Sequence, residues 1–270
     1  MKIVTFNINS IRTRVHQIEA LVEKHSPDVI CIQETKVHDE QFPFDLYDHL
    51  GYHIDIHGGK AHYGVATFSK HKPIAVEKGF PNDPDDAQRR MIITSYQYGE
   101  ETIKVLNGYF PQGENRDHPV KFPYKEKFYA DLLSYLQAHN LSTRTIVLGD
   151  INISPQDIDI GIGDANRKRW LKEGKCSFLP EEREWLAKIQ DTGLYDTYRT
   201  INPDVHDKFS WFDYRSRGFE RDPKRGLRID TIFACDWLNQ RAVASDIDYD
   251  IRGMERPSDH APVWTEFKLD

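Results

Sequence analysis

An aspartate and a histidine stand side by side near the carboxyl end of this 270-residue chain, at Asp259 and His260. They lie between Pro257 and Pro262, whose rings fix φ and restrict the local backbone. In a regular strand the two side chains would point to opposite faces, but in a loop that leads into a strand they can converge on one cleft. The run that begins at Val263 alternates as a half-buried strand does. An isolated Asp-His pair is more often a solvated turn, so a catalytic interpretation needs support from other residues.

Other apolar runs along the chain also end in residues that bind metals or transfer protons. These residues are Asn7, Glu34, Tyr109, Asp150 with Asn152, and Asp230. In open α/β sheets ligands collect at the carboxyl ends of strands, so separate runs that deliver polar groups to one edge would build a site there. For any single residue, a polar side chain entering a turn is the simpler explanation. Because buried acids are costly unless they are paired or bound to metal, the whole set favours a functional site.

The ligand atoms in this set narrow the choice of metal. Carboxylates and side-chain amides are hard oxygen ligands, which suit Mg²⁺ or Mn²⁺ better than Zn²⁺. Cys31, Cys176 and Cys235 have no C-x-x-C spacing, so we expect neither a zinc site nor a disulfide framework and interpret them as small buried hydrophobic residues. A hard divalent ion that keeps several waters commonly binds substrate phosphate. The set therefore predicts phosphoryl chemistry.

The spacing of apolar residues predicts the elements that position these groups. Strands at residues 2–8 and 28–32 flank a helix that Ser10 would cap and Pro27 would end, which is the size of a parallel β-α-β crossover. Short runs separated by turns predict an antiparallel meander at residues 52–56, 64–69, 74–80, 91–98 and 102–109. The other expected elements are a helix at 121–140, a helix opened by Pro180 and ended by Gly193, and strands at 145–148, 227–235, 243–251 and 261–267.

Composition limits the class of protein. With 39% hydrophobic and 29% charged residues, the sequence is typical of a soluble globular protein. No linker rich in Gly, Ser or Pro divides it, so we expect residues 1–270 to form a single domain. It has no apolar stretch of the roughly 20 residues that a membrane span needs and no signal-peptide pattern, so we expect a cytoplasmic protein without a membrane partner. A formal charge of -7 is the wrong sign for binding nucleic acid through the overall field, so a polyanion must meet a local patch or metal ions.

Six motifs follow one another in order along nearly the whole chain. They are Thr5-Phe6-Asn7-Ile8-Asn9, Ile32-Gln33-Glu34-Thr35-Lys36, Asn107-Gly108-Tyr109-Phe110-Pro111, Leu148-Gly149-Asp150-Ile151-Asn152, Leu227-Arg228-Ile229-Asp230 and Ser258-Asp259-His260. Together they resemble the motifs of the endonuclease/exonuclease/phosphatase superfamily, and within it those of the exonuclease III family of bacterial AP endonucleases. Further matches at residues 161–163, 166–170 and 209–216 separate this family from relatives that act on lipids or nucleotides. The resemblance implies a four-layer α/β sandwich of the DNase I-like type. In this fold two mixed β-sheets pack face to face, helices cover both outer faces, and the site lies at one rim.

The resemblance also implies a metal site. Glu34 would be the principal metal ligand, with Asn7 and Asp259 beside it, and Asp150 and Asn152 would complete the surroundings of the ion. The implied ion is Mg²⁺, and Mn²⁺ would be able to substitute for it.

Carried over to the matching positions, the resemblance implies the catalytic roles. Asp150 would orient or deprotonate the attacking water, and Asn152 and Tyr109 would contact the scissile phosphate. His260, held by Asp230, would stabilise charge on that phosphate in the transition state. Such a division of labour agrees with the physical demands of in-line phosphoryl transfer, which needs positioning and charge neutralisation more than covalent catalysis. Which carboxylate acts as the base stays open.

Two basic segments, at residues 167–169 and 215–228, could offset the negative net charge where DNA binds. Such runs are usually solvated faces. Here aromatic residues are interleaved with them, and cations hold phosphates while aromatic rings contact sugars and bases. The aromatic residues are Trp170, Trp211, Phe212, Tyr214 and Phe219. The candidate phosphate contacts are Arg89, Arg90, Gln112 and Arg167.

Recognition of an abasic site would depend on a small apolar pocket. Leu227 and Ile229 would share one face of the predicted strand close to Asp230, and the family resemblance adds Trp211 as a third wall, with Phe212 next to it. Such a pocket would admit a base-less sugar and exclude a normal nucleotide by size. Unstacking costs least where no base is present, which adds selectivity without any contact to a base. Core packing is the plainer explanation for Ile229 alone.

We therefore predict a Mg²⁺-dependent DNA repair phosphodiesterase, acting as a monomer, that cleaves duplex DNA 5′ to abasic sites and removes nucleotides and blocking groups from 3′ ends. Two alternatives stay open on the sequence alone. One is a relative with another phosphodiester substrate, such as a nonspecific nuclease or an RNA or phospholipid hydrolase. The other is a noncatalytic nucleic-acid-binding module, against which the presence of Glu34, Asp150 and His260 counts.

Overall fold

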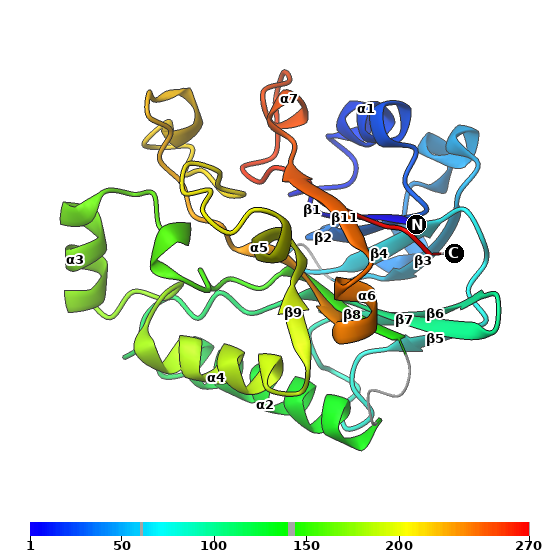
Figure 1. The fold of residues 1–270 in the computed structure, drawn as a ribbon, viewed down its shortest axis with the longest axis horizontal. Coiled ribbons are helices and arrows are strands. Elements are labelled where there is room, and N and C mark those ends of the chain that lie inside the picture. Colours follow the sequence, from blue (N-terminus) through cyan, green and yellow to red (C-terminus); the bar gives the residue numbers. More distant parts are fainter. Residues whose placement is uncertain (60–61, 140–143, 270) are drawn as a thin grey trace.

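The structure is a computed structural model, and it describes residues 1–59, 62–139 and 144–269 (Figure 1). Within these ranges the strands form two six-stranded sheets. The first sheet contains β1 (Lys2–Asn7), β2 (Val29–Gln33), β3 (His53–His57), β4 (Val65–Ser69), β11 (Ala242–Ile247) and β12 (Val263–Phe267). The second contains β5 (Ala75–Lys78), β6 (Met91–Tyr98), β7 (Glu101–Tyr109), β8 (Arg144–Asp150), β9 (Leu194–Asp196) and β10 (Asp230–Cys235).

Helices cover the outer faces of both sheets. They are α1 (Val15–His25), α2 (Lys121–Ala138), α3 (Asp164–Lys172), α4 (Pro180–Gln190), α5 (Thr197–Ile201), α6 (Asp236–Asn239) and α7 (Tyr249–Arg252). Short 3-10 helices lie at Asp39–Gln41, Phe44–Leu46, Asp48–Leu50, Asp157–Asp159 and Gly218–Glu220. Figure 1 shows α1 and α7 beyond the first sheet and α2 and α4 beyond the second. The main hydrophobic core joins the two sheets, with Ile3 and Cys31 from the first and Val105 and Ile146 from the second. The predicted four-layer sandwich is therefore confirmed.

Each sheet is centred on one parallel pair of strands joined through a helix. In the first sheet β1 and β2 are parallel and α1 connects them, which confirms the predicted crossover. In the second sheet β7 and β8 are parallel and α2 connects them. Strands β12 and β10 run antiparallel to β1 and β8, so their first residues lie at the edge where the parallel pairs end. Asp230, the first residue of β10, consequently pairs in register with Asp150, the last residue of β8.

A pair of glycines brings β7 and β8 close together just before this edge. Gly108 and Gly149 are partners in register, and Gly149 has a φ of 140°. A Cβ atom on Gly149 would lie 1.8 Å from the carbonyl oxygen of Gly108. A side chain at this position would therefore push apart the two strands that deliver Tyr109 and Asp150.

Several predicted elements differ from the observed ones. Ser10 does not cap a helix, because α1 begins only at Val15. The backbone N–H groups of Ser10 and Ile11 instead donate to the carbonyls of Glu34 and Thr35, 2.9 and 3.1 Å away, so the chain first ties itself to the end of β2. The predicted meander is also divided, because β3 and β4 belong to the first sheet while β5, β6 and β7 belong to the second.

Two predicted strands are too long. The strand predicted to begin at Leu227 begins at Asp230, because the backbone of Leu227 pairs with Trp211 through hydrogen bonds of 2.9 and 3.0 Å. The strand predicted to reach Ile251 ends at Ile247, where Asp248 caps α7 by accepting from the N–H of Ile251 at 3.0 Å. Helix α3 was not predicted. The predicted end of α2 at Asn140 lies outside the described residues.

The predictions for Pro180 and for the three cysteines agree with the structure. Pro180 begins α4 as a first-turn proline. The three cysteines are free and buried. None of the helices in the described ranges is both long enough and apolar enough to cross a membrane.

Candidate active site

A cavity of about 270 Å³ opens at the edge where the two sheets deliver their polar residues. Its lining combines residues from both sheets with residues from the loops beyond them. The lining residues are Glu34, Tyr109, Gln112, Asp150, Asn152, Trp170, Ser177, Trp211, Ile229, Asp259 and His260. Most of the predicted site residues therefore do come together. Ser177 was missed, because nothing in its local sequence distinguishes it from an ordinary loop serine.

Three buried side chains form the innermost part of the site. His260 Nδ1 lies 2.8 Å from Asp230 Oδ2, and His260 Nε2 lies 3.8 Å from Asp150 Oδ2. The second oxygen of Asp230, Oδ1, is buried and has no hydrogen-bond donor among the described residues. The predicted Asp230–His260 pair is thus present, and Asp150 lies within ion-pair distance of the other ring nitrogen of His260.

The environment moves two pKa values in this group. Burial raises the pKa of Asp150 to about 7; the charge on His260 opposes this rise, while that on Asp230 adds to it. Burial alone would lower the pKa of His260, but the charges of Asp230 and Asp150 outweigh it and raise the pKa to about 10. At neutral pH His260 is therefore an imidazolium that can donate from both nitrogens, while Asp150 is close to its titration point and able to take a proton.

Two buried serines hold this group in place. Ser210 Oγ accepts from the backbone N–H groups of Ile229 and Asp230 at 3.0 and 2.9 Å. Ser258 Oγ donates to the carbonyl of Asn7 at 2.7 Å and accepts from the N–H of His260 at 3.2 Å. Neither serine was predicted as a site residue. The sequence did contain a signal for both, because Ser210 precedes Trp211 and Ser258 precedes Asp259 within the motifs that resemble the family.

Asn7, at the end of β1, joins two carboxylates. Its Nδ2 donates to Glu34 Oε2 at 3.0 Å and to Asp150 Oδ2 at 2.9 Å, while its Oδ1 accepts from the N–H of Asn9 at 3.0 Å. In this orientation Asn7 is a hydrogen-bond donor that brings an acid of one sheet against an acid of the other. The predicted role of its carbonyl oxygen as a metal ligand stays a prediction.

A second chain of contacts links Glu34 to Asp259. Lys36 Nζ lies 2.9 Å from Glu34 Oε1 and donates to Asn9 Oδ1 at 2.6 Å. Asn9 Nδ2 in turn donates to Asp259 Oδ1 at 2.9 Å, and Trp211 Nε1 donates to Asp259 Oδ2 at 3.1 Å. Asn9 and Lys36 were not predicted as site residues, although they follow Asn7 and Glu34 by two positions in the same motifs.

Glu34 and Asn152 adopt a left-handed backbone conformation, with φ values of 58° and 55°. Such values are uncommon outside glycine and persist where the surroundings enforce them, often at functional sites. Asn152 is held by its N–H, which donates to Asp150 Oδ1 at 3.2 Å, and by its Nδ2, which donates to the carbonyl of Phe110 at 2.9 Å. These conformations turn both side chains toward the cavity that they line.

The donor set of the cavity fits a hard divalent cation. Each oxygen of Glu34 and Asp259 accepts from a neighbouring side chain, and a carboxylate oxygen with one such bond keeps a lone pair. Asp150, Asp230 and His260 also form a group whose ligand atoms lie within 4.8 Å of one another, a spacing that could hold a metal ion. Because His260 is protonated on both nitrogens at neutral pH, the carboxylates of Glu34, Asp150 and Asp259 are the better ligands.

The predicted apolar pocket is only partly present. Trp211 and Ile229 line the cavity, as predicted. Leu227 does not line the cavity, although it packs in one buried cluster with Ile229 and Trp211, as predicted. The strand predicted to present Leu227 and Ile229 is wrong, because β10 begins only at Asp230. Phe212 is fully buried against Phe219, with the ring centroids 5.1 Å apart, so in this structure it supports the wall and offers no surface to a substrate.

The candidate phosphate contacts occupy different environments. Gln112 lines the cavity. The guanidinium of Arg90 lies between the rings of Tyr63 and Tyr109, 4.5 and 4.7 Å from their centroids, and donates to the carbonyl of Tyr109 at 3.0 Å. Burial, followed by the charge of Glu34, raises the pKa of Tyr109 well above its usual value, so its hydroxyl keeps its proton. Arg167 on α3 forms an ion pair with Asp157 outside the cavity.

The basic segment predicted at 215–228 is exposed over most of its length, including Arg215, Arg217, Arg221 and Arg225. Arg228 is an exception, and counting it among DNA-binding cations was wrong. Its side chain is fully buried, and its guanidinium pairs with Asp159, whose carboxylate is fully buried as well.

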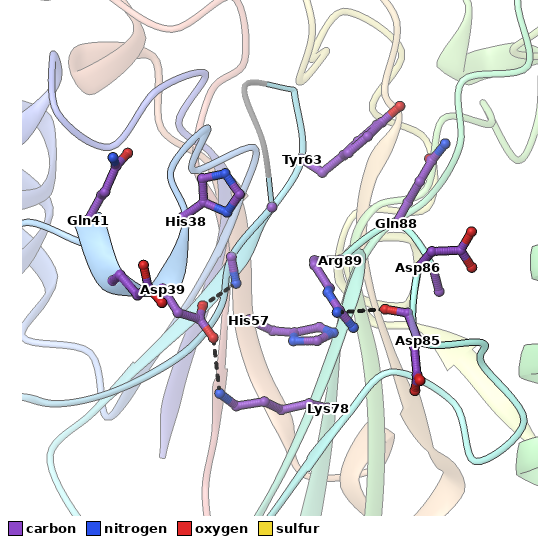
Figure 2. A pocket seen from close by; sticks show the side chains of 14 residues that line it. His38, Asp39, Gln41, His57, Tyr63, Lys78, Asp85, Asp86, Gln88 and Arg89 are labelled. Carbon is purple, nitrogen blue, oxygen red and sulfur yellow. Dashed lines mark hydrogen bonds and ion pairs between the residues drawn. The ribbon is translucent and has the colours of Figure 1, made fainter.

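A larger cavity, of about 1040 Å³, lies between the edge strands β3 and β5 (Figure 2). Figure 2 shows the ring of His57 between the side chains of Lys78 and Arg89. Arg89, one of the candidate phosphate contacts, therefore lines this cavity rather than the one that holds His260. Among the described residues, the group of acids and histidine with metal-ligand spacing is found at the smaller cavity.

Comparison with known proteins agrees with this geometry. Residues 4–260 match the endonuclease/exonuclease/phosphatase family. The chain is 56% identical to the exodeoxyribonuclease III of Haemophilus influenzae over 269 residues, which cover 99% of this chain and 100% of that protein. The structure of an AP endonuclease from Archaeoglobus fulgidus superimposes with a TM-score of 0.90 at 34% identity, covering 100% of both chains. A Neisseria 3′ phosphatase bound to a product DNA hairpin also has a TM-score of 0.90, 34% identity and full coverage of both chains. The chain therefore belongs to the endonuclease/exonuclease/phosphatase family, among the DNA repair nucleases of the exodeoxyribonuclease III type.

Proposed function

We propose that this protein hydrolyses the phosphodiester bond 5′ to abasic sites in duplex DNA, and that it also removes nucleotides and blocking groups from 3′ ends. The observation that carries this proposal is the cavity that joins an acid of titratable pKa, Asp150, to the imidazolium of His260 beside an indole wall, Trp211. Its volume of about 270 Å³ is below the roughly 300–1,000 Å³ usual for small-molecule sites, which suits a flipped sugar that has lost its base. Relatives named as an exodeoxyribonuclease III, an AP endonuclease and a 3′ phosphatase support these three activities.

The residues of the cavity divide the chemical work. Asp150 takes the proton of the attacking water as the oxygen of that water bonds to phosphorus. The bond from phosphorus to the 3′ oxygen breaks, and the departing oxygen takes up a proton from solvent. His260 donates to a non-bridging oxygen of the phosphate, and Asp230 keeps the imidazole charged and oriented through its 2.8 Å contact. The amide of Asn152 and the protonated hydroxyl of Tyr109 contact the same phosphate from the β8 and β7 sides.

We propose Mg²⁺ as the resident ion, with Mn²⁺ able to replace it, held by Glu34, Asp259 and Asp150. A divalent ion in this position supplies neutralisation of the developing phosphate charge. The hard oxygen donors of the cavity, whose described lining residues include no cysteine, support this choice over Zn²⁺.

Hydrolysis of a duplex with one abasic analogue, measured with Mg²⁺, with Mn²⁺ and with excess chelator, tests the proposed activity. We expect incision 5′ to the analogue with either ion and none in chelator. Glu34→Ala should reduce the rate far more than it reduces DNA binding, because the carboxylate acts on the ion. Glu266→Ala is the matched control, since Glu266 pairs with Lys2 at the opposite end of β1 and β12. Full activity in chelator would show that the proposed metal dependence is wrong.

The abasic preference is tested separately at Trp211. Trp211→Ala enlarges the cavity, so it should reduce the ratio of rates on abasic and intact duplexes while leaving the metal requirement unchanged. Trp211→Phe keeps a ring but loses the N–H that contacts Asp259, so most of the preference should remain. An unchanged preference ratio in a folded Trp211→Ala protein would contradict the assignment of this wall.

We propose that residues 1–270 act as a single domain, which the continuous core between the two sheets supports. We also propose that the protein is a monomer and that it acts in the cytoplasm. Light scattering of the purified protein with and without duplex DNA tests the oligomeric state.

A further inference from the structure

Helix α2 reaches the active site from behind through two side chains one turn apart. Residues four apart share a helix face, and Lys125 and Tyr129 both point from α2 to the backbone that follows Asp150. The Tyr129 hydroxyl donates to the carbonyl of Ile151 at 2.7 Å, and Lys125 Nζ donates to the carbonyl of Asn152 at 2.9 Å. Lys125 Nζ also lies 3.2 Å from the carbonyl of Gln112. Two of the three carbonyls therefore belong to residues that line the catalytic cavity.

A buried charge pair holds Lys125 in this position. Lys125 Nζ lies 2.5 Å from Oε1 of Glu182, and both side chains have no exposed surface. Lys125 lies on α2 and Glu182 on α4, and Figure 1 shows these helices side by side. The second oxygen of Glu182 accepts from the N–H groups of Ser177 and Leu179, both at 2.8 Å. Through Glu182 the pair thus also holds Ser177, another residue of the cavity wall.

A buried charge pair is seldom the most stable way to join two helices. Removing two charges from water costs free energy that their mutual attraction often only offsets, and apolar residues of similar volume commonly stabilise the folded protein equally well or better. Neither Lys125 nor Glu182 takes part in the proposed hydrolysis. Lys125, with its three donors, binds two carbonyl oxygens and a carboxylate, which an apolar side chain cannot do.

The conformation of Asn152 supplies a reason for these contacts. Its φ of 55° is left-handed, a conformation that asparagine adopts more readily than most residues other than glycine but one that still depends on the contacts around it. The contacts to Asp150 and Phe110 fix its N–H and its side chain, and the contact to Lys125 fixes its carbonyl. Without Lys125, the carbonyl of Asn152 loses the hydrogen bond that ties it to α2 among the described residues.

We propose that Lys125, with Glu182 as its counter-charge, is a positioning residue for the phosphoryl-transfer reaction: it holds Asn152 in its left-handed conformation and so keeps its amide turned toward the phosphate. This inference rests on the proposed role of Asn152 as a phosphate contact. Tyr129 acts in the same direction, one peptide earlier, and more weakly because its contact is neutral.

The main test is the double variant Lys125→Met/Glu182→Gln, assayed on a duplex with one abasic analogue. It removes both charges while keeping similar side-chain volumes, and the glutamine keeps an oxygen for the N–H groups of Ser177 and Leu179. We expect a folded protein whose kcat is at least tenfold lower while its KM for DNA is nearly unchanged. Tyr129→Phe should lower kcat about twofold to threefold.

Matched controls come from a contact at the other end of the same helix, between Tyr135 of α2 and Lys104 of β7. The hydroxyl of Tyr135 contacts Glu77 at 3.1 Å and Lys104 at 3.0 Å, away from the cavity. Tyr135→Phe therefore removes a comparable hydroxyl contact, and Lys104→Met removes a lysine charge that is less buried than that of Lys125. Both variants should alter stability while leaving kcat at the wild-type value. Equal losses of kcat in these controls would mean that α2 acts only through general stability, which would overturn the proposal.

The Asn152→Ala background separates this inference from the function on which it rests. If Lys125 acts through Asn152, the double variant should add little to the loss already caused by Asn152→Ala, and a crystal structure of the double variant should show residue 152 outside the left-handed region. An unchanged kcat in the folded double variant, or a full additional loss in the Asn152→Ala background, would overturn the positioning role. An unchanged kcat in Asn152→Ala alone would instead overturn the phosphate contact proposed for Asn152.

Discussion

Two buried ionic clusters lie on either side of Ile229, and they differ in how their acids are compensated. On one side Asp230 joins Asp150 and His260 at the catalytic cavity. On the other side Arg228 is enclosed by acids from distant parts of the chain. Its Nε lies 2.7 Å from Asp159 Oδ1 and its Nη2 lies 2.6 Å from Asp196 Oδ2, and Arg199 Nη2 lies 2.5 Å from Asp159.

The difference appears in the pKa values of the acids. Burial would raise the pKa of Asp159, but the charges and hydrogen bonds of Arg228 and Arg199 outweigh it, and the pKa lies below its usual value. For Asp150 burial prevails and the pKa rises to about 7. A buried acid with guanidinium partners stays ionised and has a structural role, whereas a buried acid that faces another acid is able to take a proton or a cation. We call these the paired cluster (Asp159, Asp196, Arg199, Arg228) and the catalytic cluster (Asp150, Asp230, His260).

The largest effect is expected from breaking the paired cluster. Arg228→Met leaves two buried carboxylates without their main partner, so the free energy of unfolding should fall by about 3–5 kcal/mol. Because none of these residues lines the catalytic cavity, kcat of the folded protein should stay within about twofold of wild type. Urea unfolding and steady-state kinetics on an abasic duplex measure the two quantities. A large loss of kcat without a loss of stability would show that the two clusters are not distinct in function.

Breaking the catalytic cluster should instead lower kcat far more than it lowers the free energy of unfolding. His260→Ala and Asp230→Ala should each lower kcat by roughly 10²–10³-fold, because a positioned charged donor to the phosphate is lost or misplaced. The two residues act as one unit through their 2.8 Å contact, so the double variant should lose little more than either single variant. Single-turnover rates at saturating enzyme measure this coupling. Losses that multiply would mean that the two residues act independently.

The clusters should also respond to pH in opposite directions, measured as the free energy of unfolding in chelator. Asp159 has a lowered pKa in the folded protein. Its contribution to the free energy of unfolding is therefore fully present above the usual aspartate pKa and is lost as the pH falls below that value. Asp150 has a raised pKa of about 7, so the folded protein binds the extra proton and stability falls as the pH rises from about 4 to 7. The contribution of His260 is present below about pH 6.5 and is lost as the pH rises through about 10.

Matched variants show which residue causes each part of the pH profile of stability. We call the loss at acid pH the acid limb and the fall toward neutral pH the neutral limb. Asp150→Asn should flatten the fall between about pH 4 and 7 and leave the acid limb in place. Asp159→Asn in the otherwise wild-type protein should weaken the acid limb and leave the neutral one. If Asp150→Asn leaves the neutral limb unchanged, the raised pKa belongs to another group.

The smallest expected effect is stabilisation by the ion itself. A ligand that binds only the folded state at ten times its Kd stabilises by about 1.4 kcal/mol. Because a cation beside Asp150 lowers the pKa of that carboxyl, Mg²⁺ should raise Tm more at pH 8 than at pH 5. Differential scanning calorimetry of wild type and Glu34→Ala, each with Mg²⁺ and with chelator, tests this expectation. An equal shift in both proteins would place the ion outside the cavity.

Local patterns along the sequence determined a large part of this protein. Runs that end in Asn7, Glu34 and Asp150 are strands that meet at one edge, because apolar periodicity and the residues that follow a strand are local properties. The crossover from β1 through α1 to β2 was predicted from this periodicity. The crossover from β7 through α2 to β8 consists of elements that the same periodicity predicts, although their parallel pairing was not predicted. Six ordered motifs indicated the family, since together they cover nearly the whole chain.

Only the tertiary structure decided the features that depend on contacts between distant segments. Leu227 leaves the strand because Trp211 takes its backbone hydrogen bonds, and Arg228 is buried because Asp159 and Asp196 meet it there. The left-handed conformation of Asn152 is enforced from α2, whose Lys125 stands 27 residues earlier in the chain. A basic residue beside a catalytic acid looks the same in the sequence whether it faces solvent or a buried carboxylate. The difference is set by desolvation and by the partner that packing brings to it.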